Sequence, residues 1–216
     1  MSRLTHPRSV CALVMALLMV LGAVGCAGLT QPYPQKNLYV ISAGEPAAPG
    51  GSRSPSVLRI RPVRVAKPYD EKTFVYKTGE SIFTVDYYNG FLADPSPLLT
   101  GELTRWLAAS GGFAVVLGST GADHDLTLET NVTALYGDYS EKGSPKAVIE
   151  ARFVLVREEK TAYKVVFEKM YRETEPLAGA QPEQLVKGFG QAYRRMLEKL
   201  TADLRTVVAP ASRPAA

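Results

Sequence analysis

The sequence predicts an α+β fold: a single domain with a mixed, largely antiparallel sheet and two main helices packed on it. Two observations indicate this fold. Three segments between residues 126 and 171 alternate apolar and polar side chains, and the short polar turns between them are typical of an antiparallel meander. Two other segments, residues 96–110 and 182–207, repeat apolar side chains at spacings of three and four, the helical period.

The pattern of the first 25 residues predicts a secretion signal. Arg3, His6 and Arg8 form a basic region, and Val10–Gly25 is a sixteen-residue run without charge that ends in small residues. As a helix this run would span roughly 24 Å, which is short of the ~30 Å hydrocarbon core of a membrane. We therefore expect residues 1–25 to be a cleaved signal peptide rather than a permanent transmembrane helix.

Cys26 follows the small pair Val24-Gly25, and this ending resembles the lipobox of bacterial lipoproteins, although Ala23 stands where Leu is commonest. A thiol here forms a thioether with diacylglycerol, and cleavage then frees an α-amino group for a further acyl chain. Two or three chains, at ~0.8 kcal/mol per buried CH₂, hold a protein on a membrane. The alternative is an unmodified buried thiol. Ala27 follows Cys26 instead of Asp, which by resemblance to enterobacterial sorting implies the outer membrane.

Length and charge narrow the function classes. Removal of residues 1–25 leaves 191 of the 216 residues and lowers Lys plus Arg from 25 to 23 against 21 Asp plus Glu, a net charge of +2. A chain of this size buries roughly 70% of its unfolded surface in one domain without a metal or a disulfide. The near-neutral net charge and the predicted export signal argue against nucleic-acid binding.

The segment after the signal differs in composition from the rest. Residues 26–56 are rich in Pro, Gly, Ser and Gln, which predicts a lipidated Cys26 and a flexible tether with one short strand at Leu38–Ile41. Residues 57–208 are expected to form the α+β domain, and residues 209–216 a disordered tail.

Within the domain we expect a strand at 57–65, a hairpin at 74–85, and a short buried strand at 113–117 after the first helix. Each strand of the meander should carry alternating apolar residues. These are Leu126, Leu128, Val132, Ala134 and Tyr136 on the first strand, Ala147, Ile149, Ala151, Phe153 and Leu155 on the second, and Tyr163, Val165, Phe167 and Tyr171 on the third.

One histidine remains in the mature chain, His124, between Asp123 and Asp125. A His flanked by carboxylates could bind a divalent metal or act as a general base. Neighbours along a strand point to opposite faces, however, so the three side chains are not expected to converge. We expect a surface or turn-capping role, and predict no catalytic residue, metal site or cofactor beyond the acyl group on Cys26.

An aromatic cluster at Asp86–Phe91 is the other candidate site. Adjacent Tyr87 and Tyr88 cannot both face one core from a regular strand, so at least one ring should lie at the surface. Two interpretations are open, ordinary packing under a loop and contact with a partner or lipid. Aromatic residues are enriched at interface hot spots, so Tyr87, Tyr88 and Phe91 are the candidate contact residues.

Several short strings, in order, resemble a known family. They are Asn37–Ile41, Leu58–Val63, Phe74–Gly79 and Asp86–Leu92, the last leading into the Pro-started helix that holds Trp106. In this order they resemble the ABC-type transport auxiliary lipoproteins, the PqiC-like family that accompanies MCE-domain lipid transport systems. The sequence Phe-Leu-Ala-Asp-Pro at 91–95 stands where the family commonly shows a Trp-Ala-Glu-Pro-Leu-like string.

The resemblance implies a non-catalytic accessory lipoprotein on the periplasmic face of the outer membrane. It would dock a periplasm-spanning MCE protein, with envelope lipid as the cargo and homo-oligomerisation as an expectation. Two alternatives remain: a structural lipoprotein of outer-membrane protein or lipopolysaccharide assembly, and an exported hydrolase built on His124.

The lipobox generates a direct prediction. Cells fed radioactive palmitate should label the wild-type chain, and Cys26→Ser should abolish the label, because the other cysteine, Cys11, lies within the predicted signal peptide and not at its lipobox-like end. Cys11→Ser is the matched control and should label like the wild type. An unlabelled wild type would contradict the anchor.

Overall fold

The computed structural model describes residues 35–47, 53–118, 122–159 and 162–208. Its elements are β1 (Asn37–Tyr39), β2 (Ser54–Ile60), β3 (Arg64–Val65), the 3-10 helix η1 (Lys67–Tyr69), β4 (Thr73–Lys77), β5 (Phe83–Phe91), α2 (Pro95–Ala109), β6 (Phe113–Leu117), β7 (Leu126–Asp138), β8 (Lys146–Glu159), β9 (Ala162–Pro176) and α3 (Pro182–Val208).

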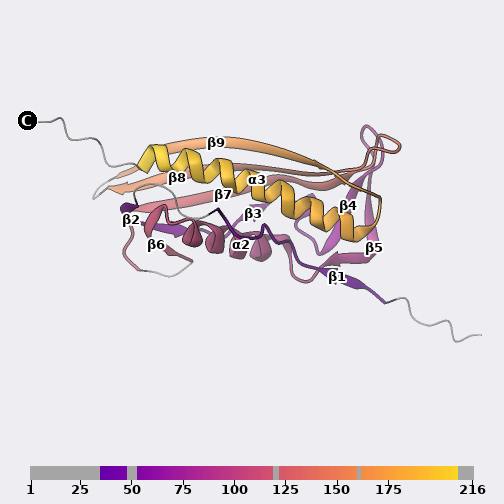
Figure 1. Ribbon diagram of the computed structural model, residues 1–216, viewed down its shortest axis with the longest axis horizontal. Coiled ribbons are helices and arrows are strands. Elements are labelled where there is room, and N and C mark those ends of the chain that lie inside the picture. Colours follow the sequence, from indigo (N-terminus) through magenta and orange to yellow (C-terminus); the bar gives the residue numbers. More distant parts are fainter. Residues whose placement is uncertain (1–34, 48–52, 119–121, 160–161, 209–216) are drawn as a thin grey trace, which may run out of the picture. The chain divides into compact units, whose positions relative to one another are not determined.

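β7 is the strand to which most of the sheet is joined. It pairs antiparallel with β8 along one edge, and parallel with β2, β3 and β4 in turn along the other. β9 extends the sheet from β8, β6 extends it from β2, and β5 followed by β1 extends it from β4. The result is one mixed nine-stranded sheet whose longest ladders are antiparallel (Figure 1), which confirms the predicted α+β fold, the hairpin and the meander.

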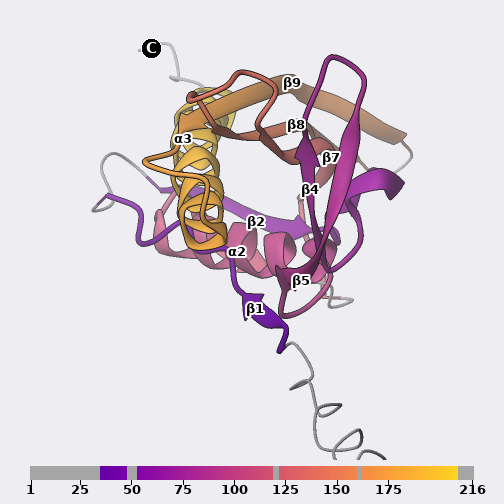
Figure 2. The same cartoon turned by 90° about the vertical axis from the view of Figure 1, so that its right-hand side faces the viewer.

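Both helices bury their apolar stripes in the core that lies against the sheet (Figure 2). The Tyr193 hydroxyl of α3 donates to the Leu99 carbonyl of α2 at 3.1 Å, and the Trp106 indole N–H donates to Thr201 Oγ1 at 3.1 Å. Trp106 and Tyr193 are each 1% exposed. Two large rings therefore place their polar atoms in hydrogen bonds between the helices, as buried Trp and Tyr require.

A bulge in β7 changes which residues reach this core. Val132 pairs with Ala151 and Ala134 with Glu150, so Thr133 is an extra residue. Ala134 and Tyr136 consequently leave the face of Leu126 and Leu128 and pack in a second, smaller cluster with Val75 and Val148. The prediction of one continuous face on this strand was wrong, and Leu135 is the residue that continues the main core.

β9 contains a similar irregularity. Leu155 pairs with Phe167 but Val156 pairs with Val165, which leaves one residue of β9 between them unpaired. The predicted common face of β9 is therefore divided. Phe167 belongs with the main core, whereas Val165 is 54% exposed.

Part of the expected tether is built into the fold. β1 pairs with β5, and Ile41 and Ala43 are buried. The Ala43 N–H donates to Glu102 Oε2 at 2.8 Å, and the backbone at Ser42 approaches Gly190 so closely that a Cβ there would lie 2.3 Å from the Ser42 carbonyl oxygen. Residues 36–47, and β2 from Ser54, therefore belong to the folded unit, although the composition of 26–56 predicts a tether.

The expected signal peptide, Cys26 and the C-terminal tail lie outside the described residues. Among the helices that the structure does describe, none is both long enough and apolar enough to span a membrane.

Candidate interaction surface

The aromatic cluster lies in a large bulge of β5. Thr73 of β4 pairs with Gly90, but Val75 pairs with Val85, so residues 86–89 have no regular partners on β4. Regular pairing resumes at Gly90, where a Cβ would lie 2.3 Å from the Lys72 carbonyl oxygen. Only glycine fits this close approach of β5 to the chain before β4.

The Asp86 carboxylate organises the bulge. Its Oδ1 accepts from the backbone N–H groups of Tyr88 at 2.8 Å and Asn89 at 3.0 Å, and its Oδ2 accepts from the Tyr76 hydroxyl at 2.8 Å. Burial alone would raise the pKa of the Asp86 carboxyl, but these hydrogen bonds outweigh it and hold the pKa below its usual value. The side chain therefore replaces the ladder bonds that the bulge removes.

Both tyrosines of the bulge are exposed. Tyr87 is 62% and Tyr88 48% exposed, and their rings meet edge to face with centroids 5.1 Å apart. The ammonium of Lys36 lies 4.8 Å from the centroid of the Tyr87 ring, within cation–π range. Because the bulge interrupts strand alternation, two adjacent rings reach the surface where a regular strand would expose one.

Aliphatic side chains of β1 and of the residues that directly follow β1 and β5 are exposed as well. Leu38, Val40 and Leu92 are 53%, 49% and 56% exposed, and the Leu92 N–H donates to the Tyr39 carbonyl at 2.8 Å. β1 lies at the edge of the sheet, since among the described strands it pairs with β5 alone. We call Leu38, Val40, Tyr87, Tyr88 and Leu92 the β1–β5 surface; exposed apolar side chains on one part of a protein are candidates for an interaction site.

Phe91 does not belong to this surface, so its assignment as a contact residue was wrong. It is 2% exposed, and its ring centroid lies 4.8 Å from that of Phe74 and 6.1 Å from that of Phe189. Phe91 pairs with Tyr39 of β1, where strand pairing is regular again and turns its side chain into the core.

His124 forms no site with its sequence neighbours. Its Nε2 lies 2.8 Å from Glu158 Oε1 and its Nδ1 lies 2.9 Å from the Ala122 carbonyl, while Asp125 accepts from the Val57 N–H. The imidazole therefore joins the turn before β7 to the end of β8. Within the described ranges, no three His, Cys, Asp or Glu side chains are grouped to hold a metal ion.

A family model that matches most of the folded unit shows which family the chain belongs to. The model of the family described as "ABC-type transport auxiliary lipoprotein component" matches residues 39–202, from β1 into α3. The chain belongs to this family. The resemblance predicted from the short strings is thus confirmed, and the β1–β5 surface lies on a domain of an auxiliary transport lipoprotein.

Solved structures show the same fold, although no curated protein matches the sequence. Protein XCC0632 from Xanthomonas campestris, of the DUF330 family, has a TM-score of 0.69 at 17% identity and covers 79% of this chain and 96% of its own. The hypothetical protein CT253 from Chlamydia trachomatis has a TM-score of 0.52 at 10% identity and covers 72% of this chain and 99% of its own. At such identities the likeness concerns the fold alone.

The bulge yields a stability prediction. Asp86→Ala should lower the free energy of unfolding at pH 7 by about 1–3 kcal/mol, because two backbone donors and the Tyr76 hydroxyl lose a charged acceptor. The exposed carboxylate in Asp123→Ala is the control and should change it by less than about 0.5 kcal/mol. Urea unfolding curves measure both.

The difference in unfolding free energy between the wild type and Asp86→Ala should depend on pH. The folded-state pKa of Asp86 is lowered, so its contribution is present above the unfolded pKa of about 3.9 and is lost as the pH falls through the folded-state value. The difference between wild type and Asp86→Ala should therefore shrink below about pH 4. A difference that is absent at pH 7 would mean that the carboxylate does not hold the bulge.

Proposed function

We propose that this auxiliary lipoprotein is a non-catalytic, lipid-anchored component of an MCE-type ABC lipid transport system, which docks the periplasm-spanning MCE protein at the outer membrane. The family match over residues 39–202 is the observation that carries the proposal. Family membership gives the association with ABC-type transport; the MCE partner and the outer-membrane location are the steps added here.

The position of the β1–β5 surface along the chain supports the proposal. Ten peptide bonds separate Cys26, the proposed acyl anchor, from Lys36, where the folded unit begins. A chain of that length spans at most about 35 Å. An anchor at Cys26 would therefore keep β1 within that distance of the membrane surface.

The chemistry of the surface suits a protein partner. It combines two exposed tyrosines with three exposed aliphatic side chains and the edge strand β1, which pairs on one side only among the described strands. Tyrosine supplies a large contact area and a hydroxyl at low cost in side-chain entropy, and it is enriched among hot-spot residues. An edge strand also offers backbone groups for pairing with an extended segment of a partner.

The mechanism is then one of attachment. The acyl chains would fix the domain to the membrane, and the β1–β5 surface would hold the end of the MCE protein against it. The ATPase and permease would lie in the inner membrane, at the opposite end of the assembly. No bond is made or broken in the cargo by this component.

Co-purification tests the proposal. After crosslinking in its own cells, the full chain with a C-terminal tag should recover an MCE-domain protein. The double variant Tyr87→Ser/Tyr88→Ser should lower the recovery at least about tenfold, a loss of 1.4 kcal/mol or more. Tyr163→Ser removes a ring that is 78% exposed on β9 and is the matched control, which should recover the partner like the wild type.

Recovery of other partner proteins, or recovery that does not depend on the tyrosines, would contradict the proposal. Components of outer-membrane protein or lipopolysaccharide assembly in place of an MCE protein would indicate a different envelope machine. Recovery that the double variant leaves unchanged, with both variants folded by circular dichroism, would exclude the β1–β5 surface as the docking site.

A further inference from the structure

His124 lies where the approach to β7 meets β2 and the end of β8. Its side chain is 9% exposed. The next residue, Asp125, joins the three segments through its backbone: its N–H donates to the Val57 carbonyl at 3.1 Å, and its carbonyl accepts from the Glu158 N–H at 3.0 Å. The imidazole therefore lies at a junction of the sheet.

Both nitrogen atoms of the His124 ring face atoms that can only accept a hydrogen bond. Nδ1 lies 2.9 Å from the Ala122 carbonyl oxygen, and Nε2 lies 2.8 Å from Glu158 Oε1. A neutral imidazole has one N–H and one lone pair, whereas the imidazolium has two N–H groups. A neutral ring would place its lone pair against an oxygen atom at one of the two positions. The geometry therefore fits the charged ring.

The Glu158 carboxylate is shared between two cations. Its Oε1 accepts from the Thr127 hydroxyl at 3.2 Å as well as facing His124, and the guanidinium of Arg59, on β2, lies 3.5 Å from the same oxygen. Burial alone would raise the pKa of the Glu158 carboxyl, but these hydrogen bonds and positive charges hold the pKa below its usual value. The carboxyl is therefore ionised at neutral pH.

Arg59 is the less well satisfied of the two cations. Its Nε is buried and has no hydrogen-bond partner among the described residues, and its contact with Glu158 is longer than a hydrogen bond of good geometry. A guanidinium keeps its charge at all physiological pH values, whereas an imidazole in an unfolded chain loses its second proton at about pH 6.5. Only His124 can therefore lose its charge near neutral pH.

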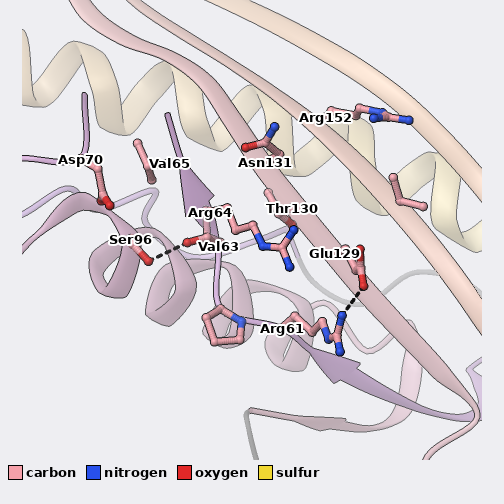
Figure 3. A pocket seen from close by; sticks show the side chains of 12 residues that line it. Arg61, Val63, Arg64, Val65, Asp70, Ser96, Glu129, Thr130, Asn131 and Arg152 are labelled. Atoms are coloured by element: carbon pink, nitrogen blue, oxygen red, sulfur yellow. Dashed lines mark hydrogen bonds and ion pairs between the residues drawn. The ribbon is translucent and has the colours of Figure 1, made fainter. Parts of the chain in front are cut away.

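The other charged or titratable side chains nearby do not replace Glu158 as a partner of the ring. The Asp125 carboxylate accepts from a backbone N–H of β2 at 2.8 Å, and Asp123 is exposed. Tyr163 of β9 is 78% exposed. Arg61 and Glu129 line a neighbouring cavity of about 680 Å³ and pair with each other (Figure 3).

We propose that Glu158 exchanges partners as the pH changes: it binds the His124 imidazolium at low pH and turns to Arg59 when the ring releases its proton to solvent at higher pH. The exchange would satisfy the buried Nε of Arg59 and remove the side-chain bond between the approach to β7 and β8. The junction would then be held by the backbone contacts of Asp125 alone. This device depends neither on the β1–β5 surface nor on the acyl anchor.

Nuclear magnetic resonance of the imidazole nitrogens tests the exchange, because His124 is the one histidine left after removal of residues 1–25. The processed chain, carrying a tag without histidine, is titrated from about pH 5 to 9 in a nonionic detergent. In the wild type both ring nitrogens should carry hydrogen at low pH, and one should lose it as the pH rises. The Arg59 Nε–H signal should shift with the same midpoint, whereas in His124→Gln it should not respond over this range.

Substitutions of the two competing groups should act in opposite directions. Glu158→Gln should lower the proton affinity of the ring at least about tenfold, because it removes the ionised acceptor, and Arg59→Gln should raise it at least about threefold, because it removes the competing cation. Glu168→Gln, whose carboxylate pairs with Arg152 at 2.6 Å, is the matched control and should stay within about twofold of the wild type.

The wild-type titration decides the proposal even where a variant fails to fold. A ring that carries a single N–H at pH 5, or an Arg59 signal that does not follow the ring, would overturn it. The same holds for a proton affinity that Glu158→Gln leaves unchanged in a folded chain.

Discussion

The two-sided pairing of β7 is the constraint on which the rest of the structure depends. β7 satisfies its backbone groups against β8 on one side and against three different strands on the other. A shift of one residue in its register would exchange the buried and exposed faces of the strand. Leu126 and Leu128, both fully buried, show which face the helices require. The positions of α2 and α3 follow from that choice.

The irregular parts of the surface arise where regular pairing stops. The bulge at 86–89 exposes two adjacent tyrosines, and the gap between β2 and β3 leaves Arg64 and Asn131 beside an open cavity. In both places a side chain takes over the task of backbone pairing, Asp86 in the bulge and Thr100 in the gap. The regular ladders build the core, whereas their interruptions leave polar and aromatic side chains exposed.

Periodicity was sufficient for most of the fold but not for its irregularities. Apolar spacing identified α3 and the meander, because both follow a fixed period. It could not locate the extra residue Thr133, which moves Tyr136 to the other face. Phe91 was assigned to the surface with Tyr87, because the sequence does not reveal where the bulge ends. His124 and Glu158, far apart in sequence, become neighbours only through the pairing of β7 with β8. The assignment of Cys26 as the lipidation site depends on the sequence pattern alone.

The claim that the β1–β5 surface contacts the transport machinery is tested most directly by site-specific photocrosslinking in living cells. A photoreactive phenylalanine analogue replaces Tyr88 in one strain and the more exposed Tyr163 in another. Irradiation is predicted to link position 88, and not position 163, to an MCE-domain protein identified by mass spectrometry. A link to that protein from position 163 alone, or a link from position 88 only to another envelope protein, would contradict the account.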